Sequence, residues 1–150
     1  MKLISINIET NKHYERIFPF LNKHQPDVIC MQEVLEEDFD YIKEKLGMDG
    51  VFRVFTRIKS KNIQYQHMQG KREGVAIFSR SIVDSGYFFY WGNEDNLSLP
   101  VDEYLEHEEY SKNYTAVWAD TLGKDGQKMR VVTTHFPVTV QGESTSHQLE

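Results

Sequence analysis

Three polar residues, each at the end of a predicted strand, could together bind a divalent cation and a phosphate group. Asn7 lies near the end of an apolar segment, Glu33 directly follows the apolar run 27–32, and His135 lies near the end of a late strand. Ligands collect beyond the carboxyl ends of strands in an open α/β sheet, so we expect these side chains to share one edge. Carboxylate and amide oxygens are hard donors that suit Mg²⁺ or Mn²⁺. The combination predicts phosphate-ester chemistry.

The predicted chemistry divides among the three side chains. Glu33 and the amide oxygen of Asn7 would hold the cation, which polarises a phosphoryl oxygen and orients a water, while His135 would donate a hydrogen bond to the developing negative charge. Each residue also has a plainer interpretation. Asn7 could be a satisfied strand residue, Glu33 could cap the following helix, and His135 could be a surface or structural histidine. Taken singly, the residues leave both interpretations open.

Hydrophobic periodicity predicts an α/β domain around these residues. The segment 3–8 predicts a first strand, and the continuous apolar run 27–32 predicts a central strand that is buried on both faces. A helix is expected between them, but Pro19 would remove an interior hydrogen bond, so this helix must kink or begin late. A second helix is expected at 36–46, because acidic residues favour its start and Gly47 supplies its stop.

Further strands are predicted downstream. The segment 51–58 alternates apolar residues with Arg53 and Arg57, as a half-exposed strand does. A tight turn is expected within 123–126, because Asp-Gly there is a strong turn signal, and the flanking strands should form a hairpin. We see no internal repeat or linker, so residues 1–150 are predicted to form one domain. The remaining predicted strands cover residues 74–79, 87–91, 114–122 and 128–136.

Composition and charge narrow the classes of function. The chain is 39% hydrophobic and 27% charged over 150 residues, which is typical of a globular domain. Its net charge of −6 argues against a generic electrostatic clamp on nucleic acid. The charge is uneven, because residues 53–73 are predominantly basic and residues 93–109 are acidic. The basic run could contact a phosphorylated ligand, whereas the acidic run is typical of a solvated loop.

The apolar stretches are all too short to cross a bilayer, and residues 1–3 lead directly into a strand rather than a signal peptide. We therefore expect a soluble, cytoplasmic protein without a transmembrane segment. The single cysteine, Cys30, lies inside an apolar run, which predicts a buried, inert thiol and excludes a disulfide within the chain.

Four segments, in their order and spacing, resemble the endonuclease/exonuclease/phosphatase superfamily, which includes DNase I, sphingomyelinases, deadenylases and inositol polyphosphate phosphatases. The second segment is the most specific, because Pro-Asp, an apolar run and Gln-Glu occur together. The resemblance implies the first half of a four-layered DNase I-like α/β sandwich, with a mixed sheet and helices on one face. The segments are residues 5–8 (SINI), 26–34 (PDVICMQEV), 74–80 (GVAIFSR) and 133–136 (TTHF).

The same resemblance implies roles for individual residues. Glu33 would be the principal metal ligand, Asn7 would contact the metal-phosphate site, and His135 would steady the scissile phosphate. Glu9 lies where some members carry an additional acidic residue near the metal. Arg80 corresponds to a further phosphate contact in some members.

The resemblance extends over essentially the whole chain but covers only the N-terminal part of the family pattern. Family members continue with an Asp-x-Asn motif that helps to position phosphate and nucleophile, and with a terminal Asp-His pair that activates the attacking water. Neither follows His135, so the general base is missing its usual carrier. We therefore expect a Mg²⁺-dependent phosphoesterase that is inactive or partial as this chain alone, either a fragment of a longer protein or a piece that needs a partner chain.

Two other functions remain open at this point. The chain could be a non-catalytic module that binds a phosphorylated ligand or a protein, and an exposed apolar sheet face would be its mark. An unrelated nucleotide-binding α/β fold is disfavoured, because no Gly-rich phosphate loop follows either early strand. The phosphorylated substrate could be a nucleic acid, a nucleotide, a lipid headgroup or an inositol phosphate.

Overall fold

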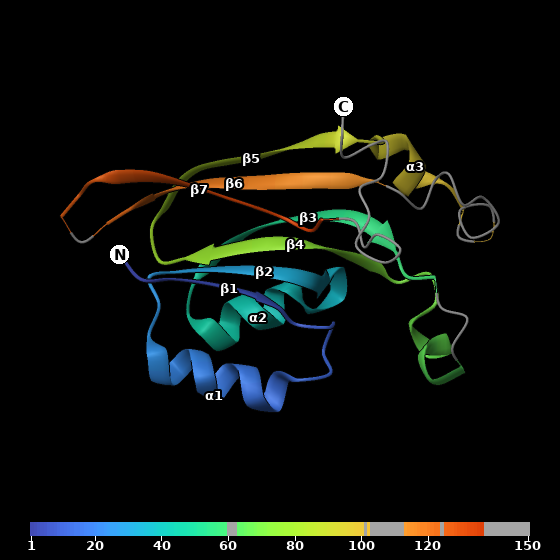
Figure 1. Ribbon diagram of the computed structural model, residues 1–150, viewed down its shortest axis with the longest axis horizontal. Coiled ribbons are helices and arrows are strands. Elements are labelled where there is room, and N and C mark those ends of the chain that lie inside the picture. The colour runs from blue at the N-terminus through green and yellow to red at the C-terminus, as the bar shows by residue number, and fades with distance from the viewer. Residues whose placement is uncertain (60–62, 101, 103–112, 124, 137–150) are drawn as a thin grey trace.

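A computed structural model of the chain describes residues 1–59, 63–100, 102, 113–123 and 125–136. Two sheets pack face to face, and α1 and α2 cover the outer face of the larger one (Figure 1). This arrangement confirms the predicted α/β class with a mixed sheet and helices on one face. The elements are β1 (Leu3–Asn7), α1 (Tyr14–His24), β2 (Val28–Leu35), the 3₁₀ helix η1 (Glu36–Asp38), α2 (Phe39–Leu46), β3 (Asp49–Arg57), the 3₁₀ helix η2 (Ile63–Met68), β4 (Arg72–Ser79), β5 (Ile82–Trp91), α3 (Glu94–Ser98), β6 (Tyr114–Leu122) and β7 (Lys128–Thr134).

The larger sheet, sheet A, has the strand order β1-β2-β4-β3, and the smaller sheet, sheet B, has the order β5-β6-β7. β1 and β2 run parallel, because α1 carries the chain back between them, whereas β4 runs antiparallel to both β2 and β3. The carboxyl ends of β1 and β2 therefore lie at the same edge of sheet A as the first residues of β4.

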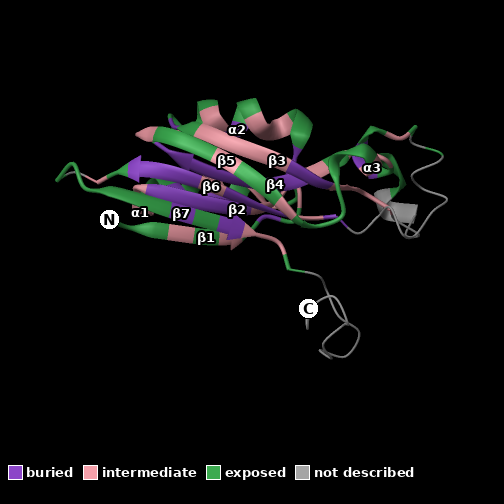
Figure 2. Ribbon diagram, turned by 90° about the horizontal axis from the view of Figure 1, so that it is seen from above, coloured by how far each residue is buried: buried purple, intermediate pink, exposed green. Residues whose placement is uncertain are grey.

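The central strands of sheet A, β2 and β4, are buried on both faces, which explains their continuous apolar runs. On the helix side, Ile29 and Phe78 pack against Leu21 of α1 and Ile42 of α2. On the other side, a second cluster joins the two sheets and includes Val28, Cys30, Val75, Ile77, Val117, Ala119 and Val131. Figure 2 shows this burial along β2 and β6. Burial also raises the pKa of the Cys30 thiol to about 11, as expected for an inert cysteine.

Several local predictions hold. β6 and β7 form the predicted hairpin, with a turn in which the N–H of Gly126 bonds the carbonyl oxygen of Gly123. α2 ends at Leu46, and Gly47 follows it in the left-handed conformation with φ 58°. Among the described residues, no helix is both long enough and apolar enough to cross a bilayer.

Other local predictions are corrected. α1 begins at Tyr14 and continues through Pro19, whose exposed position leaves the freed carbonyl oxygen one turn earlier on the solvent side. β3 is half-buried along most of its length, as predicted, but Phe55 departs from the predicted alternation and packs between the sheets. β5 is longer than the predicted strand 87–91 and pairs with β6 from Ile82 onward.

Four of the described cations in the basic run 53–73 contact other parts of the chain. Arg53 forms an ion pair with Glu94 and stacks over the Tyr87 ring. Arg57 donates a hydrogen bond to the Leu97 carbonyl oxygen at 2.8 Å. Lys71 and Arg72 pair with Glu37 and Glu36 at 2.6 and 3.3 Å. These contacts attach α3 and η1 to sheet A. Lys59 of the same run lines a cavity together with Glu33, and contact of the run with a phosphorylated ligand stays a prediction. Residues 101 and 103–109 of the acidic run lie outside the described residues.

Candidate functional site

Glu33 lies inside β2 rather than after it. The pairing of β2 with β4 shifts between Gln32 and Val34, so Glu33 is the extra residue of a β-bulge. Its φ is 60°, an uncommon conformation for a residue with a Cβ. Such backbone strain costs on the order of 1–3 kcal/mol and is typical of functional sites. The bulge takes Glu33 out of the alternating pattern and places its carboxylate at the edge of the sheet.

The structure brings Asn7, Glu33 and His135 together at that edge. Oε1 of Glu33 accepts a hydrogen bond from Nδ2 of Asn7 at 2.7 Å and lies 3.2 Å from Nε2 of His135. The hydrogen bond from His135 is the main cause that lowers the pKa of Glu33, the bond from Asn7 adds to it, and partial burial opposes both. Glu33 is therefore an ionised acceptor near neutral pH, with His135 donating through Nε2.

Asn7 directs its amide nitrogen, not its oxygen, toward Glu33. Oδ1 of Asn7 accepts a hydrogen bond from the backbone N–H of Glu9 at 3.0 Å. Asn7 thus orients the Glu33 carboxylate and also fixes the turn that follows β1. That turn contains two further residues with positive φ, Glu9 at 48° and Thr10 at 61°, and the N–H of Thr10 bonds the Glu33 carbonyl oxygen at 3.1 Å. The use of the Asn7 oxygen as a metal ligand stays a prediction.

A cavity of about 600 Å³ is lined by Asn7 and Glu33 but not by His135. Its lining also includes two further carboxylates, two lysines and two apolar side chains. Glu9 bonds Nζ of Lys12 at 2.9 Å, and this contact lowers its pKa. The full lining consists of Asn7, Glu9, Thr10, Lys12, Glu33, Ile58, Lys59, Met68 and Glu73.

Glu73 is a site residue that the sequence patterns did not indicate. It is the second residue of β4 and pairs with Leu35 of β2, so the antiparallel direction of β4 brings it to the same edge as Glu33. Burial raises the pKa of Glu73 to about 7, and the negative charge of Glu33 adds to the rise. A glutamate directly before the buried run 74–79 was the available signal, but its position depends on strand direction.

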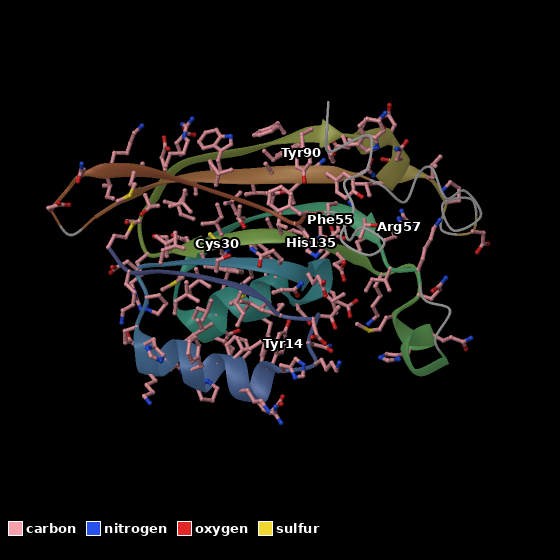
Figure 3. All side chains as sticks on the ribbon, viewed as in Figure 1. Tyr14, Cys30, Phe55, Arg57, Tyr90 and His135 are labelled. Atoms are coloured by element: carbon pink, nitrogen blue, oxygen red, sulfur yellow. The ribbon has the colours of Figure 1, made fainter. Side chains whose placement is uncertain are left out.

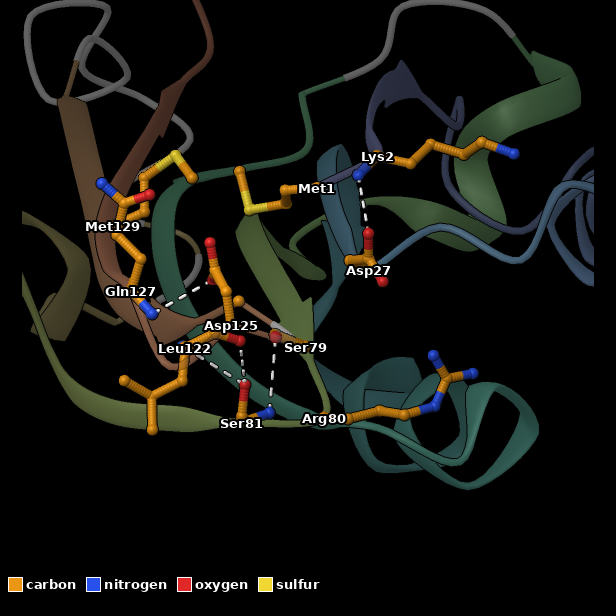
Figure 4. Close-up of a pocket in the computed structure, with 11 residues that line it drawn as sticks. Met1, Lys2, Asp27, Ser79, Arg80, Ser81, Leu122, Asp125, Gln127 and Met129 are labelled. Atoms are coloured by element: carbon orange, nitrogen blue, oxygen red, sulfur yellow. Dashed lines mark hydrogen bonds between the residues drawn. The ribbon is translucent and has the colours of Figure 1, made fainter.

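Arg80 is not brought to this site. It follows the last residue of β4, Ser79, which pairs with Val28 at the first residue of β2 and hence at the far end of sheet A. There Nη1 of Arg80 bonds the Pro26 carbonyl oxygen at 3.4 Å. Arg80 also lines a different cavity of about 730 Å³, together with Lys2 (Figure 4). The interpretation of Arg80 as a contact to a phosphate at Glu33 is corrected, because an entire strand separates the two.

The carboxylates of the smaller cavity are chemically suited to a hydrated magnesium ion. The negative charge of Glu33 adds to the raised pKa of Glu73, so a cation between these two carboxylates would relieve their repulsion. The pKa of Glu9 is lowered instead, because Lys12 binds its carboxylate. Mg²⁺ is commonly held by one or two carboxylates and keeps several waters. Within the described ranges, however, no three His, Cys, Asp or Glu side chains form a compact metal-binding group. One or two carboxylates at this edge, Glu33 first among them, would suffice for a cation that retains most of its water.

The comparison with known sequence families decides the identity. The sequence profile of the Endonuclease/Exonuclease/phosphatase family matches residues 4–139. The chain belongs to this family. No curated protein matches the chain. The matched residues include Asn7, Glu33 and His135, and family members are hydrolases that act on phosphate esters.

Solved structures show the same fold. The endonuclease/exonuclease/phosphatase of Bacteroides vulgatus is 21% identical with a TM-score of 0.57, and the match covers 89% of this chain and 51% of that chain. The mannosyl-6-phosphatase of Bacteroides thetaiotaomicron is 20% identical with a TM-score of 0.60, covering 90% and 51%. A family protein of Leptotrichia buccalis is 16% identical with a TM-score of 0.63, covering 92% and 55%. The chain thus spans about half the length of these relatives.

Proposed function

We propose that this chain carries the cation- and phosphate-binding half of a metal-dependent phosphoesterase. The single observation that supports the proposal most strongly is that one oxygen of Glu33 contacts both Asn7 and His135. Asn7 lies 26 residues from Glu33 in the sequence, and His135 lies 102 residues from it. An ionised carboxylate with two donors on one oxygen keeps its other oxygen available for a cation. Membership of a family of phosphate-ester hydrolases supports the same chemistry.

Each residue has a role in the proposal. Glu33, with Glu9 nearby, would hold Mg²⁺ or Mn²⁺, which supplies Lewis-acid polarisation of a phosphoryl oxygen when bound. Asn7 orients Glu33. His135, as an imidazolium that keeps its Nε2–H on Glu33, would donate a hydrogen bond through Nδ1–H to the phosphate oxygen that gains negative charge in the transition state. Glu73, whose pKa is about 7, is poised to exchange a proton at this edge near neutral pH.

The substrate is proposed as a phosphorylated compound. The mannosyl-6-phosphatase relative and a human nocturnin catalytic domain with bound sulfate both favour a site for a tetrahedral anion. The net charge of −6 argues against a generic electrostatic clamp on nucleic acid. The substrate class stays open among a nucleic acid, a nucleotide, a lipid headgroup and an inositol phosphate. A cytoplasmic location is part of the proposal and is consistent with the buried free thiol of Cys30.

Full turnover is proposed to need residues beyond this half of the domain. The described cavity contains no unambiguous general base besides Glu73, and the relatives are about twice as long as the part that matches. The additional segment could belong to the same protein or to a partner chain.

Hydrolysis of p-nitrophenyl phosphate and bis-p-nitrophenyl phosphate with Mg²⁺ tests the proposal. We expect slight or absent turnover by this chain, measurable turnover once the rest of the domain is supplied, and its loss on EDTA treatment. Glu33→Ala should abolish the activity, whereas Glu44→Ala, an exposed glutamate on α2, should not. Turnover that persists in Glu33→Ala would contradict the assignment.

A binding module is the second candidate function, and one observation favours it. No described element covers the outer face of sheet B (Figure 1), where Phe88, Tyr90 and Val132 are 52, 43 and 55% exposed. Trp118 lies on the same face beneath the Arg130 guanidinium at 3.9 Å. Such an apolar surface is typical of an interface. Mg²⁺-independent phosphate binding that survives Glu33→Ala would favour this candidate over the enzyme.

A further inference from the structure

We propose that Phe55 is a positioning residue that fixes the plane of the His135 imidazole. This inference rests on the proposed function of His135. The two rings stack with centroids 5.1 Å apart and planes inclined by 12° (Figure 3). Offset stacking in this distance range is favourable beyond simple burial.

The backbone of β3 places Phe55 specifically for this contact. The pairing of β3 with β4 shifts between Val54 and Thr56, so Phe55 is the extra residue of a β-bulge. Glu33 is the extra residue of the bulge in β2, on the other side of β4. Both bulges lie beside Gly74, which pairs with Val54 on one side and Val34 on the other. Bulges redirect side chains near active sites, and here two of them direct an acceptor and an aromatic ring to the same imidazole.

His135 needs such a contact, because it lies just beyond the end of β7. Its main chain is held by its neighbours: Gln32 bonds the hydroxyl of Thr133 at 2.9 Å, and Tyr90 bonds the hydroxyl of Thr134 at 3.0 Å. These bonds fix the backbone but not the ring. Rotation about the Cβ–Cγ bond of histidine is broad, and one hydrogen bond of 3.2 Å to Glu33 fixes only one ring atom.

The stack provides the missing restraint. Phe55 is only 7% exposed and packs in the cluster between the sheets, so its ring is itself immobile. The His135 side chain is 19% exposed, which leaves part of the ring accessible to a ligand. With Nε2–H directed to Glu33, the orientation of the ring plane decides where the imidazolium presents Nδ1–H, its second donor. Phe55 therefore determines the direction from which a phosphate oxygen can meet His135.

The test compares Phe55→Leu, which keeps apolar volume without a ring, with Phe55→Tyr, which keeps the ring. Val117→Ala is the matched control, because Val117 belongs to the same cluster. In this chain, proton NMR of the His135 ring, assigned by its loss in His135→Ala, reports the stack directly. We expect the ring-proton signals to move downfield in Phe55→Leu and to stay in Phe55→Tyr and Val117→Ala. If Phe55→Leu does not fold, Phe55→Met replaces it.

Calorimetric binding of inorganic phosphate with Mg²⁺ connects the stack to function. Losing one hydrogen bond to a charged group lowers affinity by roughly tenfold or more, so we expect at least a tenfold loss of phosphate affinity in Phe55→Leu and no such loss in the control. Unmoved His135 signals in Phe55→Leu would overturn the inference. The inference would also be overturned if the His135 signals moved in Phe55→Leu while its phosphate affinity stayed unchanged, given that His135→Ala loses phosphate affinity. If His135→Ala binds phosphate normally, the proposed function fails instead, while the moved signals still establish the stack.

Discussion

Replacing Glu73 with glutamine should change how the stability of this chain depends on pH. The pKa of Glu73 rises from an ordinary 4.5 to about 7 in the folded chain, mainly through burial. A native state that holds a proton more tightly than the unfolded state loses stability as pH rises through this range. The contribution is fully present below pH 4.5 and is lost above pH 7.

The magnitude follows from the size of that rise. Each tenfold change in proton affinity corresponds to about 1.4 kcal/mol, so ionising Glu73 costs the folded chain roughly 3 kcal/mol. Glutamine has no proton to lose, so Glu73→Gln should approach the stability of the wild type near pH 4.5 and exceed it by up to that amount at pH 8. Glu33 does not interfere with the comparison, because its pKa is lowered and its titration lies below this window.

Urea unfolding, followed by circular dichroism at half-unit steps from pH 4.5 to 8, measures the effect. The wild type should lose stability across this range relative to Glu73→Gln, with equal m-values. Glu44→Gln, an exposed glutamate on α2, is the control and should follow the wild type. Parallel curves for wild type and Glu73→Gln would refute the reasoning, because Glu73 would then be ionised at no cost.

Two further predictions concern the sheets. Gly74→Ala should destabilise the chain by about 2 kcal/mol or more, because a Cβ there would overlap the Arg53 carbonyl oxygen between the two bulges. Gly47→Ala is the comparison, because its new Cβ meets no atom within 4 Å but its φ stays positive, and it should lower stability by about 1 kcal/mol. Urea unfolding measures both variants. Equal losses of stability in the two would show that the Cβ at position 74 does not overlap the Arg53 carbonyl oxygen. Asp120→Asn should lower stability at pH 7, because Arg130 and a lysine hold the pKa of Asp120 well below its usual range. The difference in stability between the two proteins should disappear as pH falls through the lowered pKa of Asp120. Acid unfolding of the wild type and of Asp120→Asn, followed by circular dichroism, measures this difference.

Local signals in the sequence predicted much of the fold. The apolar run of β2, the glycine stop after α2 and the Asp-Gly turn between β6 and β7 each depend on residues close in sequence, and each is present. Asn7, Glu33 and His135 were selected because polar residues at strand ends meet at one edge, and the structure brings both Asn7 and His135 within hydrogen-bonding distance of Glu33.

Local sequence signals did not predict the direction of β4. Apolar periodicity indicates a strand but not whether it runs parallel or antiparallel to its neighbour. Antiparallel pairing reverses the strand, so Arg80 moves to the far end and Glu73 comes to the site. The bulges at Glu33 and Phe55 depend likewise on pairing with β4, and the partners of Arg53 and Lys71 lie 41 and 34 residues away, respectively. Tertiary pairing, not local propensity, decides these features.

The most direct test of the central claim is to locate a bound cation by paramagnetic broadening. Mn²⁺ titrated into this chain at micromolar concentrations should first broaden the side-chain NMR signals of His135 and Asn7, and Glu33→Ala should abolish that effect. Broadening centred on the far-end cavity beside Lys2 and Arg80, with His135 and Asn7 unaffected, would contradict the account.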